Sequence, residues 1–358
     1  MGTLPVLDFD RGLHKKYLNG FLHHQIPSFL SNMDTNRSVI LFFCVSGLEV
    51  LDDIKETPQE RKHEMIDWLY SLQVEDDPVS GFQGSTTVNT CINRGQGAPY
   101  KWGHIATTYS CLLSLLILGD NLERVNREEI VKSLRVLQLE DGSFKGAIEG
   151  AENDMRFVFC ACSISYILND WSGIDVERMV DFILKSIVSL IIKKLFVKCW
   201  LKSYDGGIGQ GPGLESHCGS TFCAIAALAL SNNLHRLSKM QIGNLRRWLL
   251  FRFDIGFNGR PNKPSDTCYS FWTGGALKIL NAYQFIESKE NPGFVLMTQD
   301  KYGGFCKWVN SGTDPMHTYF GLAGLSLMRY DNLNEMFPAL NCTKRTHDRL
   351  KNLHARWN

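Results

Sequence analysis

Apolar residues recur along this chain at the three- and four-residue intervals of helices, and strand-like alternation is scarce. An apolar face with this period is typical of a helix that buries one side against a neighbour. Examples are residues 105–118, 157–168, 220–230, 270–280 and 318–328. The pattern therefore predicts an all-α protein.

Five other segments consist of an apolar stretch followed by a glycine-rich turn that also contains an aromatic residue or isoleucine, and the helical segments named above lie between them. The turns are Gly81-Phe82, Gly142-Ser-Phe144, Gly206-Gly207-Ile208, Gly256-Phe257 and Gly303-Gly304-Phe305. Glycine supplies the left-handed conformations of helix caps and tight turns, so we interpret these turns as architecture with little chemistry of their own. The repeat period is 67 residues from Gln138 to Asp205 and 45 residues from Asp254 to Gln299. Periods of this length indicate repeated helix pairs in a curved or closed array, and a closed array would enclose a central cavity. No Pro/Ser-rich linker interrupts the chain, which predicts a single domain over residues 1–358.

The overall composition narrows the class of protein. A net charge of +1 argues against a general nucleic-acid binder, so any basic site must be local. The N-terminus shows no secretory signal pattern, and several of the eleven cysteines sit in apolar helical stretches, so we expect buried free thiols in a cytoplasmic protein. No run reaches eighteen apolar residues, so no transmembrane segment is expected.

Three residues form a candidate metal site. Asp266 and Cys268 lie two residues apart, and His317 follows forty-nine residues after the cysteine. A carboxylate, a thiolate and an imidazole are a zinc ligand set, and three protein ligands leave the fourth position open, as a catalytic zinc requires. Just upstream, Arg260 and Lys263 lie in a stiff proline-containing loop suited to holding phosphate oxygens. Together these features predict a metal-bound nucleophile that attacks a phosphorylated substrate.

With these features in place, the chain resembles the protein prenyltransferase β subunits, and among them the type I geranylgeranyl-transferring branch. The resemblance covers about residues 37–357 and rests on three motifs. The motifs are Arg-Pro-Asn-Lys-Pro-x-Asp-Thr-Cys-Tyr-Ser-Phe-Trp at 260–272, Glu-Gly-Ala-Glu-Asn-Asp-Met-Arg-Phe at 149–157, and Gly-Leu-Glu-Ser-His-x-Gly-Ser-Thr-Phe at 213–222. It implies an α6–α6 barrel, or α/α toroid, whose cavity faces a separate helical α subunit.

The resemblance also assigns chemical roles. It implies zinc held by Asp266, Cys268 and His317, with the acceptor cysteine sulfur in the fourth position. It implies a diphosphate site whose members can each donate a hydrogen bond; these are His217, Arg260, Lys263 and Tyr269. Lys307 stands where the farnesyl-transferring enzymes carry an aspartate that helps hold magnesium. A lysine there supplies positive charge directly, so the resemblance implies a reaction that does not require magnesium, with Lys307, Tyr269 and His217 acting on the leaving group.

The expected substrates are geranylgeranyl diphosphate and proteins, such as small GTPases, that end in a Cys-a-a-X tail with a Leu-like final residue. The residues that match the isoprenoid and peptide pocket are Val39, Phe43, His104, Ala106, Arg156, Phe157 and Trp272. The farnesyl enzymes place a tryptophan at the position of Val39, and valine leaves room for one more isoprene unit.

Three features depart from the family pattern. Residues 188–202 form a basic, apolar insert that lengthens one repeat spacing. It could be an amphipathic membrane-binding helix, an extension of the preceding helix, or translated non-coding sequence, which is the interpretation we favour. Cys218 stands where the family usually has glycine, and it would add backbone strain if that position needs a positive φ. Phe159 replaces a tyrosine of the farnesyl enzymes.

Other functions remain open at the level of sequence. The chain could be the β subunit of a farnesyltransferase or of the Rab-directed geranylgeranyltransferase. A terpene cyclase has a similar helical toroid, but it would need an acidic protonating motif and no zinc ligands. A non-catalytic helical-repeat binding module would leave the Asp/Cys/His set as coincidence.

Overall fold

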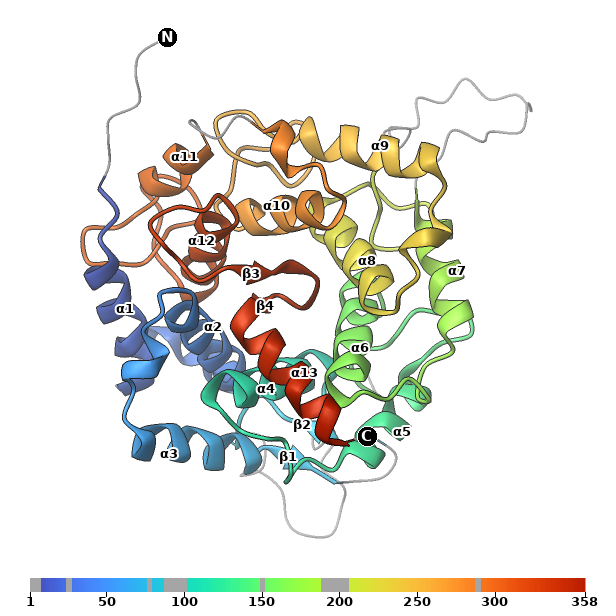
Figure 1. Ribbon diagram of the computed structural model, residues 1–358, viewed down its shortest axis with the longest axis horizontal. Helices are drawn as coiled ribbons and strands as arrows, with labels where there is room; N and C mark the ends of the chain where they lie inside the picture. The colour runs from blue at the N-terminus through green and yellow to red at the C-terminus, as the bar shows by residue number, and fades with distance from the viewer. Residues whose placement is uncertain are drawn as a thin grey trace.

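The computed structural model describes residues 8–23, 28–75, 79–86, 102–148, 152–187, 206–286 and 291–357. Within these residues, six helices form a closed inner ring (Figure 1). The inner helices are α2 (Arg37–Val50), α4 (Ile105–Leu118), α6 (Met155–Leu168), α8 (Cys218–Leu230), α10 (Tyr269–Ile279) and α12 (Pro315–Leu327). Each inner helix contacts the next, and α12 contacts α2, which closes the ring.

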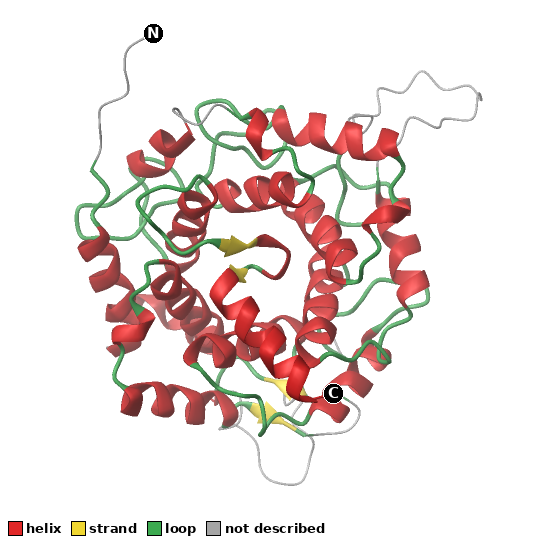
Figure 2. Ribbon diagram, viewed as in Figure 1, coloured by secondary structure: helices red, strands yellow, loops and turns green. Residues whose placement is uncertain are grey.

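Six further helices surround the inner ring, and this second layer is clear in Figure 2. They are α1 (Arg11–His23), α3 (Gln59–Tyr70), α5 (Arg127–Leu137), α7 (Val176–Ser186), α9 (Lys239–Leu250) and α11 (Asn291–Met297). The position of a helix in the inner or the outer layer follows from how its apolar residues are distributed. The outer helix α7 buries Met179, Val180 and Ile183 on one face, whereas α4 is buried along nearly its whole length. A helix that is apolar all round must be covered on every side, and an amphipathic helix covers it. The predicted α/α toroid is thus confirmed.

The glycine-rich turns connect five of the outer helices, α3, α5, α7, α9 and α11, to the inner helix that follows each. Their aromatic or isoleucine side chains are 0 % exposed; these are Phe82, Phe144, Ile208, Phe257 and Phe305. Two positions show why these turns need glycine. Gly142 and Gly303 have φ values of +91° and +92°, and a Cβ atom there would clash with the backbone of the next outer helix, at Arg178 and Leu13. The turns therefore seat one repeat against its neighbour, as their architectural interpretation predicted.

A repeated hydrogen bond aligns the inner helices at one end of the barrel. The backbone N–H at the start of an inner helix donates to a carbonyl of the next turn along the chain. The pairs are Ser38 to Gly84 (2.9 Å), Ile105 to Gly146 (2.8 Å), Met155 to Gln210 (2.9 Å), Cys218 to Gly259 (2.8 Å) and Thr267 to Lys307 (3.0 Å). These bonds satisfy donors that a helix leaves unpaired at its N-terminus, and they place residues of neighbouring repeats side by side.

The C-terminal segment lies across the opposite end of the ring (Figure 1). It consists of β3 (Met336–Phe337), η6 (Pro338–Leu340), β4 (Cys342–Thr343) and α13 (Lys344–Trp357), and β3 pairs with β4 in antiparallel register. The buried carboxylate of Glu49 on α2 accepts hydrogen bonds from Arg345 and Thr343, and Tyr109 on α4 donates to the Leu340 carbonyl at 3.1 Å. This segment closes the end where the inner helices finish.

The remaining elements are short. A second antiparallel pair joins β1 (Gln73–Val74) to β2 (Gly81–Phe82). The other 3-10 helices among the described residues are η1 (Ser28–Asn36), η2 (Ile54–Glu56), η4 (Leu234–Arg236) and η5 (Tyr283–Phe285). Within the described ranges, no helix is both long and apolar enough to cross a membrane. The insert expected at 188–202 lies outside the described residues.

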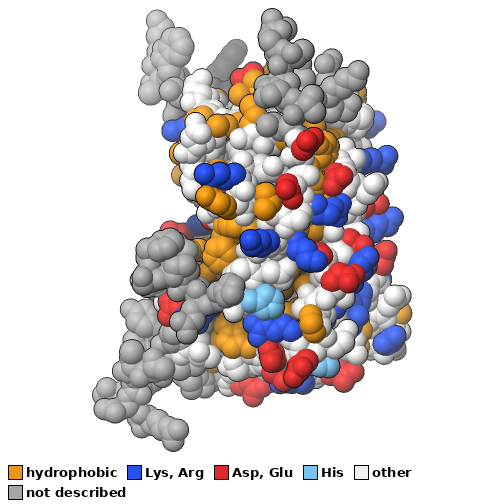
Figure 3. All heavy atoms as spheres, turned by 90° about the vertical axis from the view of Figure 1, so that its left-hand side faces the viewer, with side chains coloured by type: hydrophobic (Ala, Val, Ile, Leu, Met, Phe, Trp, Pro, Cys, Tyr) orange, Lys and Arg blue, Asp and Glu red, His pale blue; other side chains and the backbone are white. Residues whose placement is uncertain are grey.

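The surface carries charges of both signs. On the face shown in Figure 3, acidic and basic side chains are interspersed among apolar and neutral ones. This mixture agrees with the net charge of +1 and with the expectation that a basic site must be local.

Candidate metal and anion site

Most of the predicted site residues lie at or near the N-terminal ends of the inner helices. Four of these helices begin with a side chain that accepts a hydrogen bond from the first turn of the helix; these are His104 on α4, Asp154 on α6, His217 on α8 and Asp314 on α12. Such capping satisfies free backbone N–H groups. Because helix N-termini carry partial positive charge, this end of the barrel is suited to an anionic ligand.

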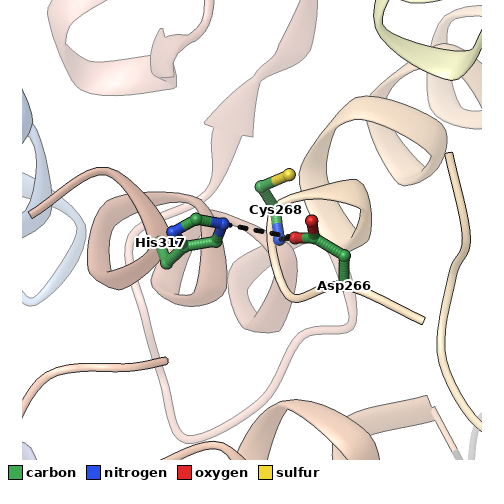
Figure 4. Close-up of side chains that lie close together, drawn as sticks. All are labelled: Asp266, Cys268 and His317. Atoms are coloured by element: carbon green, nitrogen blue, oxygen red, sulfur yellow. Dashed lines mark hydrogen bonds and ion pairs between the residues drawn. The ribbon is translucent and has the colours of Figure 1, made fainter. Parts of the chain in front are cut away.

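Asp266, Cys268 and His317 converge at this end (Figure 4). Their ligand atoms all lie within 4.8 Å of one another, and all three residues are buried. Asp266 precedes α10 and accepts a hydrogen bond from the Cys268 backbone N–H at 2.9 Å, and its Oδ1 lies 3.3 Å from Nε2 of His317 on α12. One carboxylate, one thiol and one imidazole are thus brought close enough to bind one metal ion, and this donor set fits zinc.

Asp314 fixes the orientation of the His317 ring. Its Oδ2 lies 2.6 Å from Nδ1 of His317, while its Oδ1 accepts from the His317 backbone N–H at 2.9 Å. A carboxylate that accepts from Nδ1–H directs Nε2 toward the metal position. Asp314 is not among the site residues predicted from the sequence. Its signal was present, because an aspartate three residues before a histidine at a helix start can both cap the helix and bind the ring.

The electrostatics of the three residues reflect their burial and their mutual contacts. Burial alone would lower the pKa of His317, but hydrogen bonds with Asp266 and Asp314 raise it to about 9. Burial would raise the pKa of Asp266, and hydrogen bonds from His317 and Cys268 outweigh it and lower that pKa. Burial, followed by the Asp266 charge, raises the pKa of the Cys268 thiol. A bound cation would favour the thiolate.

His217 and Tyr269 form a second pair beside this group. The Tyr269 hydroxyl lies 2.9 Å from Nε2 of His217, and Nδ1 of His217 accepts from the Gly219 backbone N–H at 3.0 Å. Because Nδ1 is an acceptor, the ring proton of neutral His217 sits on Nε2 and is directed to Tyr269. Burial, and then the nearby Arg260 charge, lowers the pKa of His217, which favours this neutral form.

The predicted cations occupy neighbouring turns. Arg260 is bound to Glu215, with 2.7 Å between Nη1 and Oε2. The Lys307 ammonium lies 3.8 Å from Oδ2 of Asp266 and 4.5 Å from the centre of the Trp308 ring. Lys263 is exposed, and no ion pair of Lys263 is found in the described part of the chain. Thus Lys307 reaches the candidate metal group, whereas Lys263 is not brought into contact with it.

Aromatic rings line the inner ring in a closed circuit. Successive contacts join Phe42 to Tyr109 (5.9 Å between ring centres), Tyr109 to Phe159 (5.4 Å), Phe159 to Phe222 (5.6 Å), Phe222 to Trp272 (5.0 Å), Trp272 to Phe320 (4.4 Å), and Phe320 to Phe43 (5.7 Å). The circuit visits all six inner helices. The predicted pocket residues Val39, Phe43 and Trp272 are only partly buried on these helices.

The remaining pocket residues group around α4 and α6. The His104 ring contacts the Phe157 ring edge-on at 5.7 Å, and Ala106 supplies the backbone N–H that His104 caps. Arg156 is exposed, pairs with Glu152 and with Asp154 (2.6 Å), and lies 5.4 Å from the centre of the Phe157 ring. His104 therefore serves as the N-terminal cap of α4, a role that was not predicted from the sequence.

Comparisons with known proteins match this arrangement to one family. The prenyltransferase alpha-alpha toroid domain matches residues 9–342. The β subunit of geranylgeranyl transferase type-1 from Arabidopsis thaliana is 33% identical, covering 94% of this chain and 89% of the relative. The corresponding subunit from Dictyostelium discoideum is 35% identical, covering 87% of this chain and 88% of the relative. This chain belongs to the protein prenyltransferase β-subunit family.

A solved structure and a further relative also match this chain. Candida albicans protein geranylgeranyltransferase-I, solved in complex with GGPP, superposes with a TM-score of 0.81 at 26% identity, covering 96% of this chain and 99% of that one. The type-2 geranylgeranyl transferase β subunit from Saccharomyces cerevisiae is 36% identical over 75% of this chain and 82% of the relative. The chain is therefore a protein prenyltransferase subunit, and the resemblance to the type-1 geranylgeranyl branch is confirmed.

Two departures from the family pattern have structural consequences. Cys218 is the first residue of α8, it is buried, and its φ is not positive, so the condition for backbone strain at this position is not met. Its N–H bonds to the Gly259 carbonyl, and its Sγ lies 3.4 Å from the Asn258 carbonyl oxygen, so the thiol fills space between two turns of the prenyltransferase barrel. Phe159, which replaces a tyrosine, packs edge-on against Tyr109 and Phe222 within the aromatic circuit.

Proposed function

We propose that this chain is the catalytic β subunit of a zinc-dependent protein geranylgeranyltransferase. It would join geranylgeranyl, from geranylgeranyl diphosphate, to the cysteine of a C-terminal Cys-a-a-X tail. The observation that carries the proposal is the buried Asp266–Cys268–His317 group beside the His217–Tyr269 pair and Lys307. Asp266, Cys268 and His317 would hold zinc through one carboxylate oxygen, Sγ and Nε2. Bound zinc would favour the thiolate of the acceptor cysteine at neutral pH.

The surrounding residues would stabilise the leaving group. In the reaction a carbon–sulfur bond forms, the bond between the lipid C1 and the diphosphate oxygen breaks, and the thiol proton is released. Negative charge builds on the departing diphosphate, and Arg260, Lys263 and Lys307 would offset it. His217 would donate to the Tyr269 oxygen, which leaves the Tyr269 hydroxyl hydrogen free to donate to the diphosphate. The helix starts at this end add partial positive charge. Because Lys307 supplies a cation directly, we expect no magnesium requirement.

The aromatic circuit supports an isoprenoid ligand. Phe43 and Trp272 would pack against the chain, and Val39 leaves more room than an aromatic residue for a fourth isoprene unit. His104, Ala106, Arg156 and Phe157 would surround the end of the acceptor peptide, and Ala106 offers space for a leucine-sized residue. The relatives of this chain are named as subunits, which supports a separate α subunit as partner. Exposed apolar residues on the turns at the site end also suit a partner; they are Leu214, Tyr302, Trp308 and Val309.

A single-turnover assay tests the proposal. The chain is co-expressed with a type I α subunit and given labelled geranylgeranyl or farnesyl diphosphate and a peptide ending in Cys-a-a-Leu, such as a small-GTPase tail, with and without magnesium. We expect geranylgeranyl transfer that does not depend on magnesium and that is lost in Cys268→Ala. A preference for farnesyl with a magnesium requirement would contradict the interpretation of Val39 and Lys307. Absence of transfer in a complex that binds zinc would contradict the proposed reaction.

The cellular setting and the insert are tested separately. We propose that the enzyme works in the cytoplasm, and fractionation of the tagged chain in cells would check this. We also expect deletion of residues 188–202 to preserve or raise activity and solubility, because the insert interrupts the repeat spacing. Loss of activity in the folded deletion variant would show that the insert is functional.

A further inference from the structure

Arg260 is held from a neighbouring repeat. Glu215 belongs to the turn before α8, and Arg260 belongs to the turn before α10. The two turns are fixed to each other by the backbone bond from Cys218 N–H to the Gly259 carbonyl, at 2.8 Å. On this frame the Glu215 carboxylate accepts from Nη1 of Arg260 at 2.7 Å. This is the only ion pair of Arg260 within the described ranges of the chain.

The contact leaves part of the guanidinium available. Arginine has five N–H donors in a rigid fork, so a carboxylate that binds Nη1 restrains the position of the guanidinium and leaves other donors for an oxyanion. The Glu215 and Arg260 side chains are 55% and 41% exposed, so without the contact Arg260 would sample several rotamers in solvent. The same exposure screens repulsion between the Glu215 carboxylate and a bound diphosphate.

We propose that Glu215 is a positioning residue for the diphosphate site, acting through Arg260. The inference rests on the proposed function for the identity of the anion. Glu215 holds the guanidinium beside the His217–Tyr269 pair, where the Arg260 charge already influences His217. Orientation in advance of binding reduces the entropy lost when the diphosphate arrives.

The test is a double-mutant cycle in the heterodimer with Glu215→Gln, Arg260→Ala and both together. Binding of inorganic diphosphate is measured by calorimetry, and KM for geranylgeranyl diphosphate is measured by transfer. Glu215→Gln should weaken diphosphate binding and raise KM by about threefold to tenfold, the range expected for an exposed charged hydrogen bond, with kcat nearly unchanged. In the Arg260→Ala background the same substitution should change neither quantity.

A matched control uses the Glu177–Arg236 pair. These residues also join two repeats, at 3.0 Å, with side chains that are 75% and 32% exposed, and Glu177→Gln should leave both measurements unchanged. Tighter binding in Glu215→Gln, no change, or an equal loss in the Arg260→Ala background would overturn the inference. Failure of the proposed function would appear differently, as absence of lipid transfer by the wild-type heterodimer, and the calorimetric cycle with inorganic diphosphate would still report on Glu215.

Discussion

The Oδ2 atom of Asp314 lies 2.6 Å from Nδ1 of His317. Asp314 also begins α12, where it accepts from the His317 backbone N–H. One side chain thus caps the start of a helix and orients a candidate metal ligand, so the ligand geometry depends on the same residue that sets where the helix begins.

Asp314→Asn separates these two functions. Asparagine is a good helix cap, so the start of α12 should persist, but the negative charge that supports His317 is lost. We expect zinc affinity to fall by about tenfold to a hundredfold, as is typical for a partner of a ligating histidine. Competition with a chromophoric chelator measures this. The control is Asp175→Asn at the cap of α7, which should leave zinc affinity unchanged.

Glu49 should be critical for attaching the C-terminal segment. Its buried carboxylate binds Arg345 at 3.0 Å and accepts from the Thr343 hydroxyl at 2.8 Å. Glu49→Ala would leave the buried hydroxyl without this acceptor and lose the charged hydrogen bonds, so the free energy of unfolding should fall by about 2–3 kcal/mol. Urea unfolding measures the change.

The exposed Lys344–Glu335 pair provides the comparison for that experiment. Its charged atoms are 3.8 Å apart, and both side chains are largely solvent-exposed. Glu335→Gln should change the free energy of unfolding by less than about 0.5 kcal/mol. Equal effects of Glu49→Ala and Glu335→Gln would show that the buried carboxylate does not anchor the C-terminal segment.

Helices and the metal group could be predicted from the sequence, whereas the contacts that orient the site residues could not, and the reason is physical. Helical periodicity and glycine-rich turns are local, so the positions of α4 and α8 could be predicted to within a few residues. The repeats indicated a curved or closed array of helix pairs, and the closed toroid came from the family resemblance. Asp266, Cys268 and His317 could be grouped because their chemistry is distinctive. The contacts of Asp314 with His317 and of Glu215 with Arg260 depend on helix starts and on bonds between repeats, which residue type alone does not reveal.

The C-terminal segment shows the same limit. Helix α13 is mostly polar, and no glycine-aromatic turn precedes it, so the repeat pattern did not indicate its position. Its place across the ring is set by long-range contacts, such as the Tyr319 hydroxyl with the Asn341 carbonyl at 2.8 Å.

At acidic pH, protonation of His14 should weaken the contact between α1 and the turn before α12. Its Nδ1 accepts from the Gly304 N–H at 3.0 Å, and its Nε2–H donates to the Gln299 side chain at 2.9 Å, which requires the neutral ring. Burial lowers the pKa of His14 to about 4. The unfolded chain binds the proton below about pH 6.5, so this stabilisation is complete above that pH and is lost as the pH falls toward 4.

The variant His14→Gln measures the contribution. Between pH 7 and pH 5, the wild type should lose about 2 kcal/mol more of its free energy of unfolding than the variant, because glutamine does not titrate. Urea unfolding at pH 7 and at pH 5 gives the change in the free energy of unfolding for each protein. Equal changes in the wild type and the variant would show that His14 is not the group responsible.

Lipid selection should depend on the volume at position 39, if the proposed function holds. Val39 is a partly exposed residue of α2, one turn before Phe43 of the aromatic circuit. In Val39→Trp the indole would occupy space needed by the fourth isoprene unit, so kcat/KM for geranylgeranyl diphosphate should fall by about tenfold to a hundredfold relative to farnesyl diphosphate. Val39→Ala is the control and should keep the geranylgeranyl preference, because it adds no volume. Transfer rates with both lipids measure the ratio, and an unchanged ratio in the tryptophan variant would mean that the lipid end lies elsewhere along the inner ring.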